Sequence, residues 1–452
     1  MESVTCPSVK ETEKSPTAES YHSPLPQIKA VLVDIKDQQE VVPTSNNEDS
    51  YHLFQTMGSG AKGETLNASK YFNSLKGPEL EILKNPKCSA LPMEKQWPFL
   101  LRFPVNSFGI NLGLGSQAVL WKILATAGHV GWMQAPILIT NVIWSVAILA
   151  MILTATTYTL KIIFYFEAVR REFNHPIRIN YFFAPWVACM FLLLGAPPFL
   201  ATSIPPNICM LFVVPIFALD LKVYGEWLSG GEGRLCKVAN PSTHLSLLGN
   251  FVGAYLIAAM GYTELALFFW SIGLFHYLVL LVTLYQRLIS ATVLPKELHP
   301  IYFLFVALPS NASVSWARIM GKFDLTAKIM YFFAVFLFFT LVTQLCVLIA
   351  AFVLVIINSF NIAWWSYTLP LTILTIATVQ YSLEVKHPFT QTLAGLLTIL
   401  SSLILLSLGI MTILQTCVWK SMFPNDMAIA LQGSGKKAKR RIKELKEDLL
   451  PL

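Results

Sequence analysis

The chain has 452 residues, of which 54% are hydrophobic and 13% charged, with a mean hydropathy of +0.56 and a formal net charge of +7. Soluble globular proteins have roughly 25% charged residues, so the composition excludes that class and indicates a protein that crosses a membrane several times. Much of the positive charge lies in short loops and near the C-terminus, where it indicates membrane orientation and not nucleic-acid binding. The seven cysteines show neither zinc-site spacing nor a disulfide framework.

Two polar tails flank the apolar part of the chain. Residues 1–96 are rich in Lys, Asp, Glu, Ser, Thr and Pro, which predicts a disordered cytosolic tail. Residues 97–420 are predicted to form a transmembrane channel domain. Residues 421–452 form a basic cytosolic tail that either contacts anionic lipid or is a solvated anchor.

Ten apolar segments are each long enough for ~30 Å of hydrocarbon once tilt is allowed. We therefore expect an all-α polytopic membrane protein with ten transmembrane helices, arranged as five hairpins around a central pore. The predicted spans are 103–127, 136–167, 181–203, 207–228, 244–262, 264–286, 300–318, 325–357, 361–384 and 389–417.

Basic residues recur in alternate connections between these segments, which places both termini in the cytosol. Arg318 and Lys322 fall on the predicted outer side and run against this pattern. The cytosolic cations would raise the local anion concentration at the mouth of a pore. The predicted anion mouth consists of Arg170, Arg171, Arg178, Arg234, Lys237 and Arg287.

Proline and glycine gather in the odd-numbered segments. A proline inside a helix removes a backbone hydrogen bond, and in lipid it persists where other helices or a water-filled cavity satisfy the freed groups. We expect kinked odd helices to line the pore and smooth even helices to face lipid, the kinks lying at Pro104, Pro185, Pro309 and Pro370. The alternative is that kinks and the GxxxG pairs Gly109/Gly113 and Gly249/Gly253 serve close helix packing.

Catalytic and metal-binding motifs are missing from the sequence. It contains no P-loop, HExxH motif or nucleophile elbow, so we expect no enzyme activity, catalytic residue, metal or cofactor. The few charges within the spans are expected to snorkel to the interface: Lys161, Glu167, Asp220, Lys222, Glu226 and Lys328. Glu384 either snorkels as well or is a titratable group for proton-coupled transport.

Several stretches resemble the plant slow-type (SLAC) anion channel family, which is related to bacterial tellurite-resistance and dicarboxylate transporters. They include RFPVNSFGINLGLGSQAVLWK (102–122), FYFEAVRREFNHPIRINYFFAPW (164–186) and AWWSYTLP (363–370). The resemblance implies a homotrimer at the plasma membrane, each subunit having its own pore lined by the odd helices. It also implies passive anion efflux, with protein kinases acting on the cytosolic tails.

The resemblance also points to a pore gate. Members of this family have a phenylalanine immediately before the proline of the ninth helix, and Leu369 occupies that position here. The family's second pore aromatic, on the third helix, corresponds to Phe191. We hypothesise that Leu369 and Phe191 form a leakier constriction than two aromatic rings would, closing by bulk and dewetting.

Three functions are compatible with these features. The first is a slow-type anion channel for nitrate and chloride, which cross an apolar neck because weakly hydrated anions are cheaper to dehydrate. The second is a proton-coupled carrier of dicarboxylates or oxyanions, for which Glu384 is the candidate titratable group. The third is a membrane scaffold that transports nothing.

Overall fold

The computed structural model describes residues 97–126, 135–201, 205, 207–229, 233–290, 301–419, 422, 423 and 425, and of 287–290 and 343–359 the backbone alone. The predicted N-terminal tail and most of the C-terminal tail lie outside the described residues, so the proposed tail boundaries stay predictions. All described residues belong to one unit, Asn67–Leu452.

Five consecutive pairs of helices make up the described part of the chain, in which every regular element is helical. The pairs are α6 (Phe108–Thr126) with α7 (Ile137–Phe164), α9 (Ala184–Leu194) with α11 (Ile208–Ser229), α13 (His244–Ala259) with α14 (Thr263–Ser290), α15 (Leu304–Met320) with α16 (Leu325–Ser359), and α17 (Thr368–Glu384) with α18 (Pro388–Ile413). Shorter helices connect or flank them: α5 (Phe99–Arg102), α8 (Phe166–Asn174), α10 (Pro198–Ala201), α12 (Leu235–Val238) and the π-helical η7 (Leu414–Val418).

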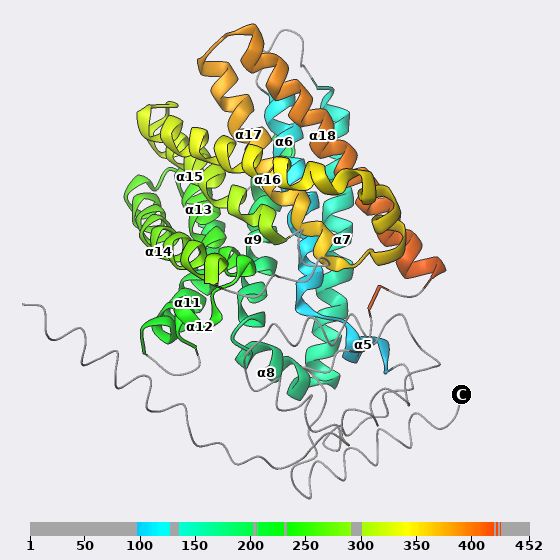
Figure 1. The fold of residues 1–452 in the computed structure, drawn as a ribbon. Coiled ribbons are helices and arrows are strands. Elements are labelled where there is room, and N and C mark those ends of the chain that lie inside the picture. Colours follow the sequence, from blue (N-terminus) through cyan, green and yellow to red (C-terminus); the bar gives the residue numbers. More distant parts are fainter. Residues whose placement is uncertain are drawn as a thin grey trace, which may run out of the picture. The chain divides into compact units, whose positions relative to one another are not determined.

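The first helix of each pair belongs to a closed ring. α6 packs against α9, α9 against α13, α13 against α15, α15 against α17, and α17 against α6 again. The second helix of each pair packs on the outside of its own partner (Figure 1). We call the ring members the inner helices and their partners, α7, α11, α14, α16 and α18, the outer helices.

The inner and outer helices differ in how much of their surface is buried inside the protein. Of the most apolar stretch of η6 and α17, 83% lies inside the protein, against 11% for α7 and 22% for α18. The outer helices expose leucine, isoleucine, valine and phenylalanine along their outward faces, which only a hydrocarbon solvent accommodates over such an area. The inward placement expected of the odd segments is therefore what the structure shows.

Six described helices are long and apolar enough to cross a membrane, or seven if the pair Phe166–Asn174 and Arg178–Leu194, bent by 109°, counts as one span. The inner helices α13 and α15 have 16 and 17 residues, about 24–26 Å at the rise of an α-helix. They fall short of ~30 Å of hydrocarbon by themselves. The ten spans predicted from the sequence therefore need the turns that extend the inner helices.

A 3₁₀ turn precedes every inner helix. These turns are η2 (Val105–Ser107), η3 (Arg178–Phe183), η4 (Pro241–Thr243), residues 301–303 and η6 (Ile362–Tyr367). Two begin at an asparagine whose side chain accepts a backbone N–H: Asn240 from Ser242 at 2.8 Å and Asn361 from Ala363 at 2.9 Å. Asparagine favours this local bond over continuing a helix, which fixes where the turn starts.

The four prolines predicted as kinks lie at two kinds of position. Pro309 is inside α15. Pro104 directly precedes η2, Pro185 is in the first turn of α9, and Pro370 is the third residue of α17, where the 3₁₀ turn becomes α-helix. Pro185 and Pro370 therefore lie where a 3₁₀ turn passes into α-helix within one helical stretch, Arg178–Leu194 and Ile362–Glu384, whereas Pro104 lies before η2. Pro104 is thus outside a helix interior, and kinking of the pore helices at these prolines stays a prediction.

Candidate anion pore

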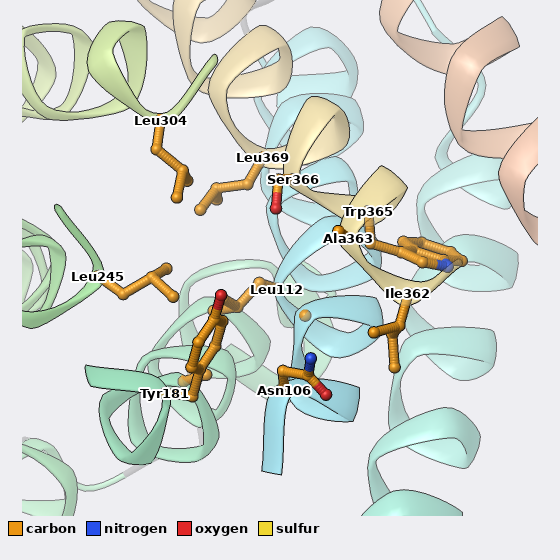
Figure 2. Close-up of a pocket in the computed structure, with 12 residues that line it drawn as sticks. Asn106, Leu112, Tyr181, Leu245, Leu304, Ile362, Ala363, Trp365, Ser366 and Leu369 are labelled. Atoms are coloured by element: carbon orange, nitrogen blue, oxygen red, sulfur yellow. The ribbon is translucent and has the colours of Figure 1, made fainter. Parts of the chain in front are cut away.

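One pocket receives residues from all five inner helices or their entry turns. It has an empty volume of ≈ 440 Å³, its opening to solvent included. Figure 2 shows Leu245, Leu304 and Leu369 reaching into it from three different helices. Its lining residues, all uncharged, are Asn106, Gly109, Leu112, Tyr181, Ala184, Leu245, Leu304, Ile362, Ala363, Trp365, Ser366 and Leu369.

The pocket lies where the five inner helices begin. Each helix contributes a residue from its first turn, namely Gly109, Ala184, Leu245, Leu304 and Leu369. The inner helices therefore start at one end of the ring. The N-terminal end of a helix is partially positive because its peptide dipoles align, so this arrangement favours an anion without any fixed charge in the pocket.

Of the two predicted gate residues, the pocket contains one. Leu369 lines it and is 2% exposed. Phe191 is equally buried but belongs to the last turn of α9, at the far end of that helix from the pocket-lining Ala184. There it packs against α6, since a Cβ added to Gly115 would lie 3.0 Å from the Phe191 Cβ. The structure therefore brings Leu369, and not Phe191, to this pocket.

A seam between α6 and α17 holds the helix that carries Leu369. Gln117 Nε2 donates to Thr372 Oγ1 at 3.0 Å. A Cβ added to Gly113 would lie 3.0 Å from the Thr368 Cβ and 3.1 Å from the ring of Trp365, so only glycine allows this approach. This supports the packing alternative for Gly113, whereas Gly109 of the same GxxxG pair lines the pocket.

In the second GxxxG pair, Gly249 also serves close helix packing. A Cβ on Gly249 would meet Ile216 of α11 at 2.9 Å. Its role is therefore close contact between an inner and an outer helix. Neither Gly249 nor Gly253 lines the pocket.

The predicted basic mouth consists of exposed and partly buried cations. Arg170 and Arg171 lie on α8, where the Arg170 Nη1 is 3.9 Å from the Glu167 carboxylate. Arg178 begins η3, Arg234 precedes α12 and Lys237 lies within it. The side chain of Arg287 lies outside the described residues. None of the other five side chains, which the structure describes, lines the pocket itself.

A buried ion pair lies behind this region and contradicts the expectation of snorkelling for Lys161. Its side chain is 0% exposed, and its Nζ lies 3.0 Å from Glu172 Oε1 and donates to the Phe103 carbonyl at 2.6 Å. The Tyr158 hydroxyl donates to the other Glu172 oxygen at 2.9 Å. Excellent geometry of this kind is what a buried charge pair requires. The network joins α7 and α8 to the chain just before η2.

Asp220 is a second exception to snorkelling. It is 2% exposed on α11, beside Tyr224 and Asn250, yet neither carboxylate oxygen completes a hydrogen bond of good geometry. The Asn250 amide instead donates to the Tyr224 hydroxyl at 2.9 Å. An isolated carboxylate is costly in such surroundings, so the position of Asp220 differs from that of a side chain that reaches the membrane surface.

Glu384 does not approach the pocket. It is exposed at the last residue of α17, fifteen positions or about 22 Å along the helix from Leu369. Within the described residues, no group of three His, Cys, Asp or Glu side chains is arranged to hold a metal ion.

Sequence reasoning missed the neutral polar side chains of the pocket. Asn106, Tyr181 and Ser366 lie on η2, η3 and η6 and carry no motif of their own. What these three residues share is a position just before an inner helix, and the sequence alone does not show the 3₁₀ turns that define that position.

Comparison with known proteins matches this architecture to one family. Residues 102–413, more than half of the chain, match the family model for the voltage-dependent anion channel, SLAC1. The chain is 44% identical to the guard cell S-type anion channel SLAC1 of Arabidopsis thaliana over 90% of this chain and 72% of that protein. It is 46% identical to the Arabidopsis S-type anion channel SLAH3, over 81% of this chain and 57% of the relative.

A bacterial relative is more distant. The Haemophilus influenzae tellurite resistance protein TehA homologue is 25% identical over 60% of this chain and 78% of its own length. The match to the family model and the identity to the plant channels establish that the chain belongs to the SLAC1 voltage-dependent anion channel family.

Proposed function

We propose that this protein is a slow-type anion channel that carries nitrate and chloride passively through a pore inside its ring of five inner helices. The observation that supports this most strongly is the uncharged pocket at the shared starting end of those helices. Five helix N-termini attract an anion there, while the absence of a fixed cation among the lining residues lets it leave again.

The basic residues outside the pocket support the same function. Arg170 on α8, Lys237 on α12 and Arg234, just before α12, are exposed ahead of η3 and η4. Such cations raise the local concentration of anions without binding them tightly. A cation channel would instead need carboxylates or carbonyl rings at its mouth.

Leu369 is the proposed gate. Its side chain is nearly fully buried where α17 begins, opposite Leu245 and Leu304 in the pocket (Figure 2). Leucine side chains that close together exclude water, so they would resist the passage of a hydrated anion without any charged barrier. We expect Phe191 to add a second constriction farther along the pore.

The experiment is voltage-clamp recording in oocytes with chloride, nitrate or malate in the bath. A steady current that reverses at the anion equilibrium potential is the expected result. Basal current should rise in Leu369→Ala and fall in Leu369→Phe relative to the parent. Equal currents in all three would rule out Leu369 as the gate, and no anion current in any of them would contradict the channel.

The carrier alternative gains nothing from the structure, because Glu384 is exposed and remote from the pocket. The recordings test it directly. Current that is unchanged by external pH and by Glu384→Gln fits a channel, whereas a strict dependence on either would favour proton coupling.

The cellular setting is part of the same proposal. We infer a multi-pass protein of the plasma membrane with ten spans, both termini in the cytosol, and a homotrimeric assembly with one pore per subunit. Protein kinases acting on the tails are the proposed regulators. The basic loops after α7 and α11 support this orientation.

A further inference from the structure

A set of neutral polar side chains, which we call the polar collar, lines the pocket. It consists of Asn106, Tyr181 and Ser366. All three come from the 3₁₀ turns, whereas the residues contributed by the α-helices are glycine, alanine and leucine. The hydrogen-bonding side chains of the pocket therefore come from the 3₁₀ turns and lie among apolar lining residues (Figure 2).

The Tyr181 hydroxyl points into the pocket. Figure 2 shows it on the same side as Leu112 and Leu245, below the tip of Leu369. It also interacts with the side chain of Ser242, whose own hydroxyl donates to Asn240. A phenol has one hydrogen to donate, and rotation about its C–O bond can direct that hydrogen either to Ser242 or to an anion in the pocket.

Ser366 supplies a second donor. Its hydroxyl oxygen faces the pocket in Figure 2, three residues before Leu369 on the same segment. Within the part of the chain that the structure describes, this hydroxyl makes no hydrogen bond. Neighbouring Thr368, in contrast, donates to the Trp365 carbonyl at 2.7 Å. The free hydroxyl of Ser366 is thus available to a ligand.

Loss of hydration water is the main free-energy cost when an anion moves against the leucines that line the pocket. Chloride holds its hydration water more tightly than nitrate, so it gains more from protein donors that replace water. Neutral hydroxyls suit this task, because they hydrogen-bond the anion without the strong attraction of a buried cation.

We propose that the hydroxyls of Tyr181 and Ser366 donate hydrogen bonds to the anion as it dehydrates in the pocket and thereby set the discrimination between chloride and nitrate. This inference rests on the proposed channel function. It assigns selectivity to neutral donors in the entry turns and not to the exposed arginines and lysines.

The test is the reversal potential in mixed chloride and nitrate for Tyr181→Phe, Ser366→Ala and the double variant. Each single variant removes one oxygen. A neutral hydrogen bond contributes enough that we expect the nitrate-to-chloride permeability ratio to rise about 2- to 10-fold per hydroxyl, and further in the double variant.

Matched controls remove the same groups elsewhere. Tyr285→Phe loses a phenol hydroxyl on the exposed face of α14, and Ser407→Ala loses a serine hydroxyl on α18. Neither residue lines the pocket, so both variants should keep the parental ratio. Surface delivery is measured for every variant by biotinylation.

An unchanged ratio in both collar variants, or an equal change in the controls, would overturn the inference and leave the channel proposal standing. Loss of all current in both single variants despite normal surface delivery would also overturn it, because removing a donor should change selectivity and not abolish conduction. Absence of anion current in the parent and in Leu369→Ala would instead contradict the channel itself.

Discussion

The inner and outer helices differ in both burial and composition, the outer helices being more apolar than α17. α17 buries nearly all of its side chains and carries five hydroxyl residues that are each buried: Thr368, Thr372, Thr375, Thr378 and Ser382. Each of these hydroxyls donates to a carbonyl of its own segment. α7 buries few residues and exposes large aliphatic ones. Apolarity thus identifies a span, while small and hydroxyl residues identify a helix that packs on several neighbours.

The largest effect on the free energy of unfolding is expected at Lys161, a charged residue of the outer helix α7 that is buried inside the protein. Lys161→Met leaves Glu172 as a buried carboxylate without its 3.0 Å partner, which costs about 3–5 kcal/mol. Thermal unfolding in detergent, followed by fluorescence-detected size exclusion, measures the loss. Lys222→Met is the matched control, since Lys222 pairs with Glu226 at a partly exposed site worth about 0–1 kcal/mol. Similar melting temperatures for the two variants would contradict this contrast.

Leucine truncation compares the two sets directly. Leu374 on α17 is 0% exposed and Leu406 on α18 is 61% exposed. Leu374→Ala should cost about 2–5 kcal/mol through lost contacts and a cavity. Leu406→Ala should change stability by less than about 0.5 kcal/mol, because its side chain faces lipid. The same unfolding assay measures both variants. A comparable loss of stability in the two would contradict the difference in burial between the inner and outer helices.

Glycine substitution examines the tightness of the ring. Gly113→Ala places a methyl group against Thr368 and Trp365, so we expect a loss of about 1–3 kcal/mol from overpacking. Gly409→Ala on α18 meets nothing within 4 Å and should be neutral or stabilising by up to about 1 kcal/mol. If Gly113→Ala were as stable as the parent, the α6 and α17 seam would be looser than the structure indicates.

The smallest effect concerns a junction between an inner and an outer helix. Asp324 caps α16 by accepting from the Ala327 N–H at 3.2 Å, and Trp316 of α15 donates to it at 2.9 Å. Burial alone would raise the pKa of Asp324, but the hydrogen bonds from Trp316, Ala327 and Thr326 lower it overall. Asp324→Ala should cost about 1 kcal/mol at neutral pH.

The pH dependence of that loss has a definite sign. A lowered pKa in the folded state means that the cap stabilises the protein above the unfolded value, near 3.8, and is lost as pH falls through the folded value. The difference in melting temperature between the parent and Asp324→Ala should therefore be constant above about pH 5 and shrink in stronger acid. A difference that grows on acidification would contradict this assignment of the cap.

The sequence predicts the pairing of helices and the inner position of the proline- and glycine-rich segments, because composition along each segment reflects what surrounds it. The turns were not predictable in the same way. The sequence predicts kinks at Pro104, Pro185 and Pro370, but it does not show that Pro104 lies before η2 or that Pro185 and Pro370 lie where a 3₁₀ turn becomes α-helix. Proline occurs both inside helices and near their starts, and only the local backbone conformation distinguishes the two positions.

Buried polar contacts were also beyond prediction from the sequence, since they join distant residues. Gln117 and Thr372 are 255 positions apart, and no periodicity relates them. The sequence predicts that Lys161 reaches the membrane surface, because it shows neither Glu172 nor the Phe103 carbonyl near the Lys161 Nζ. The roles of Leu369, Phe191 and the basic mouth stay predictions for the recordings to test.

The common direction of the inner helices has an electrical consequence. Five helix dipoles aligned in parallel do not cancel, so the path has a positive end at the pocket and a negative end where the inner helices finish. An anion therefore meets a different energy profile from each side, even between identical solutions. The open pore should rectify, and the sense of that rectification is set by the backbone and will persist when the exposed charged side chains are neutralised.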